Sequence, residues 1–133
     1  MYLGSIEDRL KERVLDLAFL IANSDSNYSD SEKFIIENYE QEMRISYTPR
    51  KRELEEILNS LSSANSTDKR KILLEMVALV VADGEYSIAE QTLLKKISGV
   101  FNIEEGFLTD AVGIVDDMNI LYLKASKLIK GDA

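Results

Sequence analysis

One local pattern occurs twice in the sequence, and this repeat constrains the fold more than any other feature of the chain. Residues 28–32 and 86–90 both read Tyr-Ser-x-x-Glu, and both follow an apolar stretch that ends in alanine, at Ala22 and at Ala82. A serine followed three positions later by a glutamate is the capping-box signature of a helix N-terminus. Two copies of an apolar helix, a polar loop and a capped helix indicate an internal duplication.

The first half predicts three helices. Leucine, valine and isoleucine recur at helical spacing, so residues 5–23 are expected to form an amphipathic helix with Ser5 as its N-cap. Ser29 is expected to cap a second helix. Pro49 predicts the start of a third, because proline at the first helical position loses no hydrogen bond. The inner faces of these three helices are expected to hold Leu10, Val14, Leu17, Ile21, Ile36, Tyr39, Met43, Leu54, Ile57, Leu58 and Leu61.

The second half continues the helical pattern after a polar joint at residues 60–67. Residues 72–81 are apolar almost all the way round; the valines among them also suit a buried strand, but the length favours a central helix. Gly84 is placed to end it, Ser87 to cap the next helix, and Asn102 to cap a sixth. A last segment follows Asp116-Asp117, which either break the helix or merely expose one of its turns. The expected inward residues are Leu93, Ile97, Val100, Leu108, Val112, Val115, Met118, Leu121, Ala125 and Leu128.

These patterns predict a single all-α domain spanning residues 1–133. Six or seven helices are expected in two three-helix repeats related by a pseudo-twofold axis, around two central apolar helices. Repeat one covers about residues 5–62 and repeat two about residues 68–130.

Composition excludes several functional classes. The net charge of −8 argues against nucleic-acid binding, which requires a concentrated positive field. No segment has the run of about 20 apolar residues that a membrane span needs, and no signal peptide is expected, so the protein is predicted to be cytoplasmic. The chain has no cysteine and no histidine, which removes disulfides, thiolate metal sites and the commonest general base. We therefore expect no enzymatic activity and no catalytic residues.

The residues with the clearest potential for chemistry lie in the second interhelical loop. Asp83, Glu85 and Glu90 place three carboxylates around one short turn. Capping explains most of this pattern, because Ser87 and Glu90 form a capping box. The same carboxylates also suit an oxygen cage for Ca²⁺ or Mg²⁺. Both interpretations stay open, and they are compatible with each other.

The corresponding loop of the first half does not support a known metal motif. Residues 23–36 superficially suggest an EF-hand, but the required glycine and the final glutamate are absent in either register. Asp25, Asp30 and Glu32 are left as carboxylates that could cooperate with those of the second loop. A di-iron carboxylate bundle is excluded because it needs histidine.

Residues 75–90 read Glu-Met-Val-Ala-Leu-Val-Val-Ala-Asp-Gly-Glu-Tyr-Ser-x-x-Glu, and this run resembles the signature of the TerB-like family. That family includes tellurite-resistance protein TerB and the N-terminal domain of the co-chaperone DjlA. The match continues through Leu93, Leu94, Ile97, Phe101 and Ile103 and is weaker in the first half, where Asn23-Ser24 replaces Asp-Gly.

The resemblance implies a duplicated all-helical bacterial protein linked to tellurite or other stress responses. It also implies that Asp83 and Glu90, with Glu85 as a further candidate, chelate a metal. Since the first half departs from the motif, a site shared by both copies is not implied. The expected function is that of a non-enzymatic, metal-responsive or protein-interaction module with unidentified protein partners, and the alternative is a structural scaffold without a metal.

Overall fold

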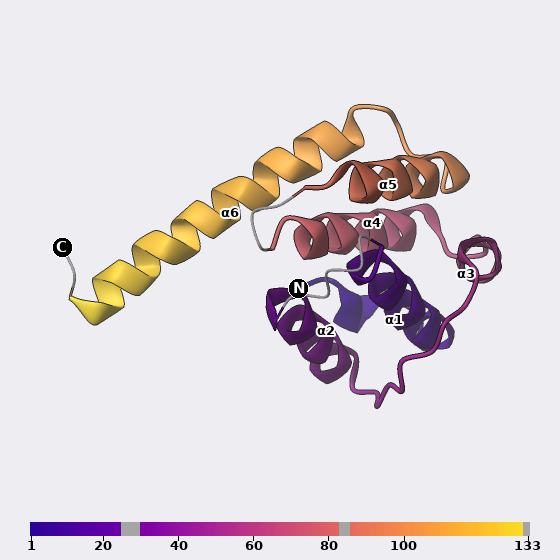
Figure 1. Cartoon of the computed structure of the whole chain (residues 1–133), viewed down its shortest axis with the longest axis horizontal. Coiled ribbons are helices and arrows are strands. Elements are labelled where there is room, and N and C mark those ends of the chain that lie inside the picture. Colours follow the sequence, from indigo (N-terminus) through magenta and orange to yellow (C-terminus); the bar gives the residue numbers. More distant parts are fainter. Residues whose placement is uncertain (25–29, 83–85, 132–133) are drawn as a thin grey trace.

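A computed structural model of the chain describes residues 1–24, 30–82 and 86–131, and these residues form helices without any strand. The all-α prediction is therefore confirmed. A short 3-10 helix, η1 (Leu3–Ser5), precedes six α-helices (Figure 1). Their bounds are α1 (Asp8–Ala22), α2 (Asp30–Met43), α3 (Leu54–Leu61), α4 (Ser66–Val80), α5 (Ile88–Val100) and α6 (Phe107–Lys130).

Helices α1 and α4 lie at the centre of the core. Helix α1 packs against α2, α3 and α4, while α4 also packs against α5 and α6. The apolar character of α4 explains its place, because a helix that is apolar all round must be enclosed. Its side chains Ile72, Leu73, Met76, Val77, Leu79 and Val80 are all buried. The contacts agree with two central helices, while the pseudo-twofold relation between the repeats stays a prediction.

Polar contacts also tie the elements to α4. The hydroxyl of Tyr39, on α2, donates to the main-chain oxygen of Glu75 on α4 (2.7 Å). The buried carboxylate of Glu75 accepts the backbone N–H of Tyr2 (2.7 Å). Burial raises the pKa of Tyr39 well above its usual value, and the nearby negative charge of Glu75 adds to the shift. These contacts hold η1 and α2 against the central helix.

The first helix begins later than predicted, and the helix after the predicted joint at residues 60–67 begins inside that joint. Helix α1 begins at Asp8 after Glu7, and Ser5 belongs to η1, where its hydroxyl donates to the main-chain oxygen of Tyr2 (3.0 Å). Helix α4 begins at Ser66 because Asn65 accepts the N–H of Asp68 (2.8 Å). The predicted cap Ser29 lies outside the described residues.

The prediction of a third helix opening at Pro49 is wrong. Residues 45–53 have no regular secondary structure, and α3 begins only at Leu54. The reason is tertiary, because side chains of this segment contact α1, as described below. Proline is equally compatible with such an irregular connection, since it needs no N–H partner there.

The predicted sixth helix also begins later than expected. Asn102 adopts a positive φ of 54°, which terminates α5 rather than capping a new helix, since asparagine tolerates this conformation. Helix α6 starts at Phe107. Val100 was expected in the core but is 46% exposed, at the end of α5.

Helix α6 is continuous through Asp116-Asp117, and both residues are exposed, so of the two alternatives the exposed turn is confirmed and the break is absent. Its first half packs on α4 and α5, where Ala111 and Val115 are buried. The expected inward positions Leu121, Ala125 and Leu128 are instead exposed, because this end of α6 extends beyond the helical body (Figure 1). No helix of the described ranges, α6 included, has both the length and the apolar character needed to cross a membrane.

Candidate functional site

Of the three predicted metal ligands, only Glu90 lies within the described residues. Its carboxylate accepts the N–H of Ser87 (3.1 Å), and its own N–H donates to the Ser87 hydroxyl (3.1 Å). The capping-box prediction is therefore confirmed. Asp83 and Glu85 lie outside the described residues, as does Asp25. Within residues 1–24, 30–82 and 86–131, no three acidic side chains converge on a possible metal position, so the metal site stays a prediction.

Replacing Ser87 with alanine is expected to lower the free energy of unfolding by about 1 kcal/mol, because α5 loses its N-cap hydrogen bond. Glu90→Gln is expected to cost less, since glutamine also completes a capping box. Chemical denaturation measures both effects. An unchanged stability of Ser87→Ala would contradict the capping role.

The same two variants test the metal prediction. If Glu90 is a ligand, Ca²⁺ or Mg²⁺ raises the melting temperature of Ser87→Ala but not that of Glu90→Gln, because only an ion bound to the folded state stabilises it. An equal rise in both variants would exclude Glu90 as a ligand.

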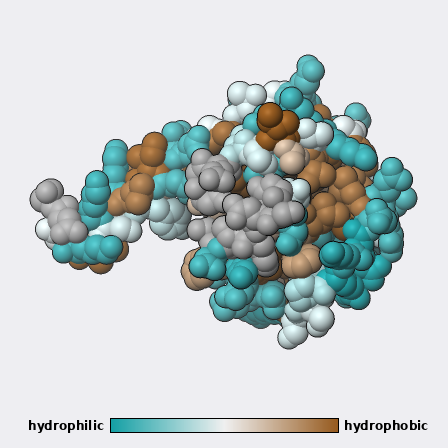
Figure 2. All heavy atoms as spheres, viewed as in Figure 1, coloured by the Kyte–Doolittle hydropathy of each residue, from teal (hydrophilic) through white to brown (hydrophobic). Residues whose placement is uncertain are grey.

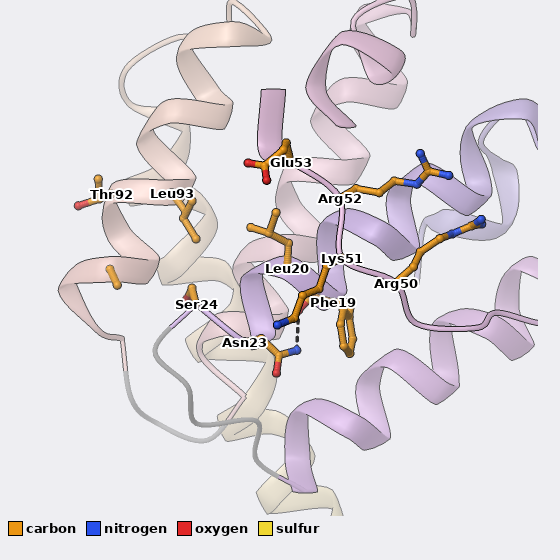
Figure 3. A pocket seen from close by; sticks show the side chains of 11 residues that line it. Phe19, Leu20, Asn23, Ser24, Arg50, Lys51, Arg52, Glu53, Thr92 and Leu93 are labelled. Carbon is orange, nitrogen blue, oxygen red and sulfur yellow. Dashed lines mark hydrogen bonds between the residues drawn. The ribbon is translucent and has the colours of Figure 1, made fainter. Parts of the chain in front are cut away.

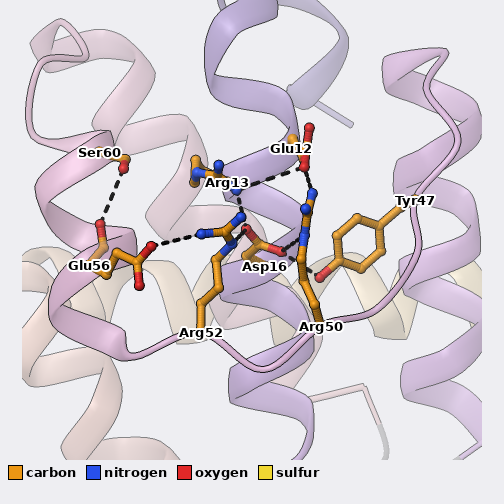
Figure 4. A network of polar contacts seen from close by, with 8 residues as sticks. All are labelled: Glu12, Arg13, Asp16, Tyr47, Arg50, Arg52, Glu56 and Ser60. Carbon is orange, nitrogen blue, oxygen red and sulfur yellow. Dashed lines mark hydrogen bonds and ion pairs between the residues drawn. The ribbon is translucent and has the colours of Figure 1, made fainter.

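The most unusual polar group of the described chain is Asp16, which is 1% exposed in the middle of the apolar helix α1. A buried carboxylate requires charged and hydrogen-bonding partners, and both oxygens of Asp16 have them (Figure 4). Arg13 donates to Oδ2 (2.6 Å), and the hydroxyl of Tyr47 donates to Oδ1 (2.7 Å). The irregular segment before α3 supplies two further cations, with Arg52 Nε 3.1 Å from Oδ2 and Arg50 Nε 3.6 Å from Oδ1.

A second layer of carboxylates neutralises the arginines around Asp16. Glu12 lies one turn before Asp16 on α1 and pairs with Arg50. Glu56, in the first turn of α3, accepts from Arg52 Nη1 (2.7 Å). The arginine side chains reach the surface, being 44% exposed for Arg50 and 23% for Arg52. The network thus joins α1 to α3 through the 45–53 segment and carries little net charge.

The hydrogen bond to Asp16 also changes the acidity of Tyr47. Burial raises the pKa of its hydroxyl, and donation to the negatively charged Asp16 raises it further. Tyr47 therefore stays protonated as a donor throughout the physiological range. Its role is to hold the 45–53 segment against α1.

A cleft of about 900 Å³ lies beside this network, between the end of α1, the segment before α3 and the start of α5. Its apolar lining comes from both sides, with Leu20 of α1 and Leu93 of α5 pointing into the space between these helices (Figure 3). The complete lining is Phe19, Leu20, Asn23, Ser24, Arg50, Lys51, Arg52, Glu53, Ala89, Thr92 and Leu93.

The basic run Arg50-Lys51-Arg52 divides between the network and the cleft. The two arginine side chains point to one side, toward α1 and Asp16, while Lys51 points to the other, toward Asn23 (Figure 3). Such alternation is expected of an extended chain. Lys51 is exposed and pairs with no carboxylate of the described residues. The cleft also contains the buried hydroxyl of Ser24, which has no hydrogen-bond partner in the described part of the chain.

Sequence reasoning did not identify this site. The sequence patterns singled out neither Asp16 nor the basic run at residues 50–52. The available signal was a carboxylate within the apolar run of the first helix, because such a group needs a cation from elsewhere in the chain. The basic run was the obvious candidate to supply that cation.

Comparison with known proteins gives no relative, since no family model, no curated protein and no solved structure matches this chain. The resemblance to the TerB-like family therefore rests on the motif residues alone. The function must be inferred from the geometry of the chain itself.

Proposed function

We propose that this chain is a non-enzymatic protein-binding module whose cleft receives a short amphipathic segment of another protein. The observation that carries the proposal is the combination of apolar side chains from α1 and α5 with Lys51 at the same opening, a lysine that pairs with no carboxylate among the described residues. Binding sites commonly have a mostly apolar lining and a few polar groups that fix orientation. The volume of about 900 Å³ suits several side chains rather than a single ion.

The charges along the cleft indicate what the bound segment should look like. Apolar side chains would contact Leu20 and Leu93, and an acidic side chain would pair with Lys51. The rest of the protein repels acidic ligands, because its net charge is −8. An acidic residue is therefore favoured only where it meets Lys51, which gives the cleft selectivity for position as well as for composition.

The sequence supports the non-enzymatic part of this proposal, because the chain has no histidine and no cysteine to act as base or nucleophile. The TerB-like resemblance supports a role in tellurite or stress responses. The alternative, a structural scaffold, predicts that the cleft binds nothing selectively.

Selection of a random peptide library on the immobilised protein tests the proposal. We expect enrichment of sequences in which leucine or phenylalanine flanks aspartate or glutamate. Lys51→Glu is expected to raise the dissociation constant of the tightest-binding peptide by about tenfold or more, because an attractive charge at the rim of the cleft becomes repulsive. Titration by fluorescence anisotropy measures the change.

Lys127→Glu is the matched control, because it makes the same charge change on the part of α6 that extends beyond the body (Figure 1). It should leave peptide affinity within about twofold, as expected for a distant exposed charge. Equal losses in the two variants, or no enrichment of any peptide class, would contradict binding in the cleft.

A further inference from the structure

The second half of α6 is exposed to solvent along its length. All residues from 119 to 130 are exposed, and they include large apolar side chains such as Leu121 (62% exposed), Leu128 (84%) and Ile129 (84%). Figure 1 shows this part of α6 extending away from the helical body, and Figure 2 shows apolar and polar residues mixed along it. An isolated helix shorter than about 12–15 residues is marginal in water, so a partner surface would stabilise it.

Five apolar residues of α6, exposed except for the half-buried Met118, follow the spacing of a coiled-coil seam. Ile114, Met118, Leu121, Ala125 and Leu128 are separated alternately by four and three residues. This repeat places them on one stripe of the helix, the arrangement that packs against another helix with the same stripe. An apolar hollow of about 410 Å³, lined by Met1, Met118, Leu121, Tyr122 and Ala125, lies along the same stripe.

The charges beside the stripe identify the second helix. Asp117 immediately precedes Met118, and Lys124 immediately precedes Ala125. Both charges therefore flank the seam on the same side, separated by two helical turns. Charges at these flanking positions determine partner choice and orientation in coiled coils. In a parallel pair of identical helices, each flank of the seam faces the opposite flank of the partner, so Asp117 and Lys124 would face Tyr122 and Ile129 and form no ion pair.

In an antiparallel pair, by contrast, the same flank of both helices lies on one side of the seam. When two copies of α6 cross near residues 120 and 121, Asp117 of one copy faces Lys124 of the other. The twofold axis gives this ion pair twice. The wider charge distribution agrees, because α6 has its acidic residues, Asp110, Asp116 and Asp117, before the crossing point and its basic residues, Lys124, Lys127 and Lys130, after it.

We propose that the occupant of this surface is a second copy of the chain, bound through antiparallel pairing of α6 with α6. The interface is isologous, since each copy contributes the same stripe and the same two charges. It is independent of the peptide cleft, which is built from α1, the segment before α3 and α5.

Sedimentation velocity of the full chain over a range of concentrations tests the pairing. The unmodified protein should dimerise, and Leu121→Glu should abolish the dimer by placing a charge in the seam. Asp117→Lys and Lys124→Asp should each raise the dimer dissociation constant about tenfold or more, because both symmetric ion pairs become like-charge pairs. Circular dichroism checks that each variant keeps its helix content.

Combining the two charge reversals, as a mixture of single variants and as a double variant, distinguishes the Asp117–Lys124 pairing from a general effect of net charge. An equimolar mixture of Asp117→Lys and Lys124→Asp should form heterodimers, and the double variant should dimerise like the unmodified protein. Asp116→Lys makes the same charge change as Asp117→Lys on the outer side of the helix and should leave the dimer intact.

Three results would overturn the proposal. One is an unmodified chain that stays monomeric at every concentration. Another is a dimer that neither charge reversal weakens. The third is a monomer whose α6 binds lipid vesicles, which would identify a membrane surface as the occupant instead.

Discussion

Replacing Asp16 with alanine is expected to lower the free energy of unfolding by about 3 kcal/mol, near the lower end of the range for breaking a buried ion pair. The variant removes the acceptor of Arg13 and Tyr47 together with the counter-charge of Arg50 and Arg52. The loss is not larger because the arginine side chains reach solvent, which stabilises them once Asp16 is absent. Urea denaturation followed by circular dichroism measures the change.

Asp16→Asn is the matched comparison, because it is nearly isosteric and keeps an oxygen for the Tyr47 hydroxyl while removing the charge. Its loss of stability should lie between those of the unmodified protein and Asp16→Ala. Tyr47→Phe should lower the free energy of unfolding by about 1.5–3 kcal/mol, the value of a hydrogen bond to a charged group. If Asp16→Ala were as stable as the unmodified protein, the network would not stabilise the fold.

The second large effect is expected in α4. Leu73→Ala should lower the free energy of unfolding by about 3 kcal/mol, because the side chain is fully buried and its removal leaves a cavity in the packed core. Ile88→Ala provides the control, since Ile88 is 81% exposed at the start of α5. Its effect should stay within about 0.5 kcal/mol, as for most surface substitutions. Similar losses in the two variants would contradict the central position of α4.

The sequence was sufficient to predict the helices whose signals are local. Helix α5 has the predicted capping box at its start, and the all-round apolar residues of α4 are buried as expected. In these elements the pattern of apolar spacing and capping agrees with the final packing, so local information determines the structure.

The wrong prediction at Pro49 has a different cause, because the structure of this segment depends on distant contacts. The segment around Pro49 stays irregular because Tyr47, Arg50 and Arg52 contact Asp16, a residue on another helix. No local pattern connects these positions, so neither the network nor the adjacent cleft was predicted. Periodicity likewise identified the apolar stripe of α6 but not whether the same chain covers it.

The way Arg50 and Arg52 hold Asp16 has a consequence for any ligand of the cleft. These two contacts fix the backbone on both sides of Lys51, so one wall of the cleft is anchored to the buried interior of α1 although it has no regular secondary structure. Binding therefore requires little ordering of that wall, and less conformational entropy is lost than in closing a free loop. The buried carboxylate of Asp16 thus preorganises a wall of the cleft although it does not itself line the cleft.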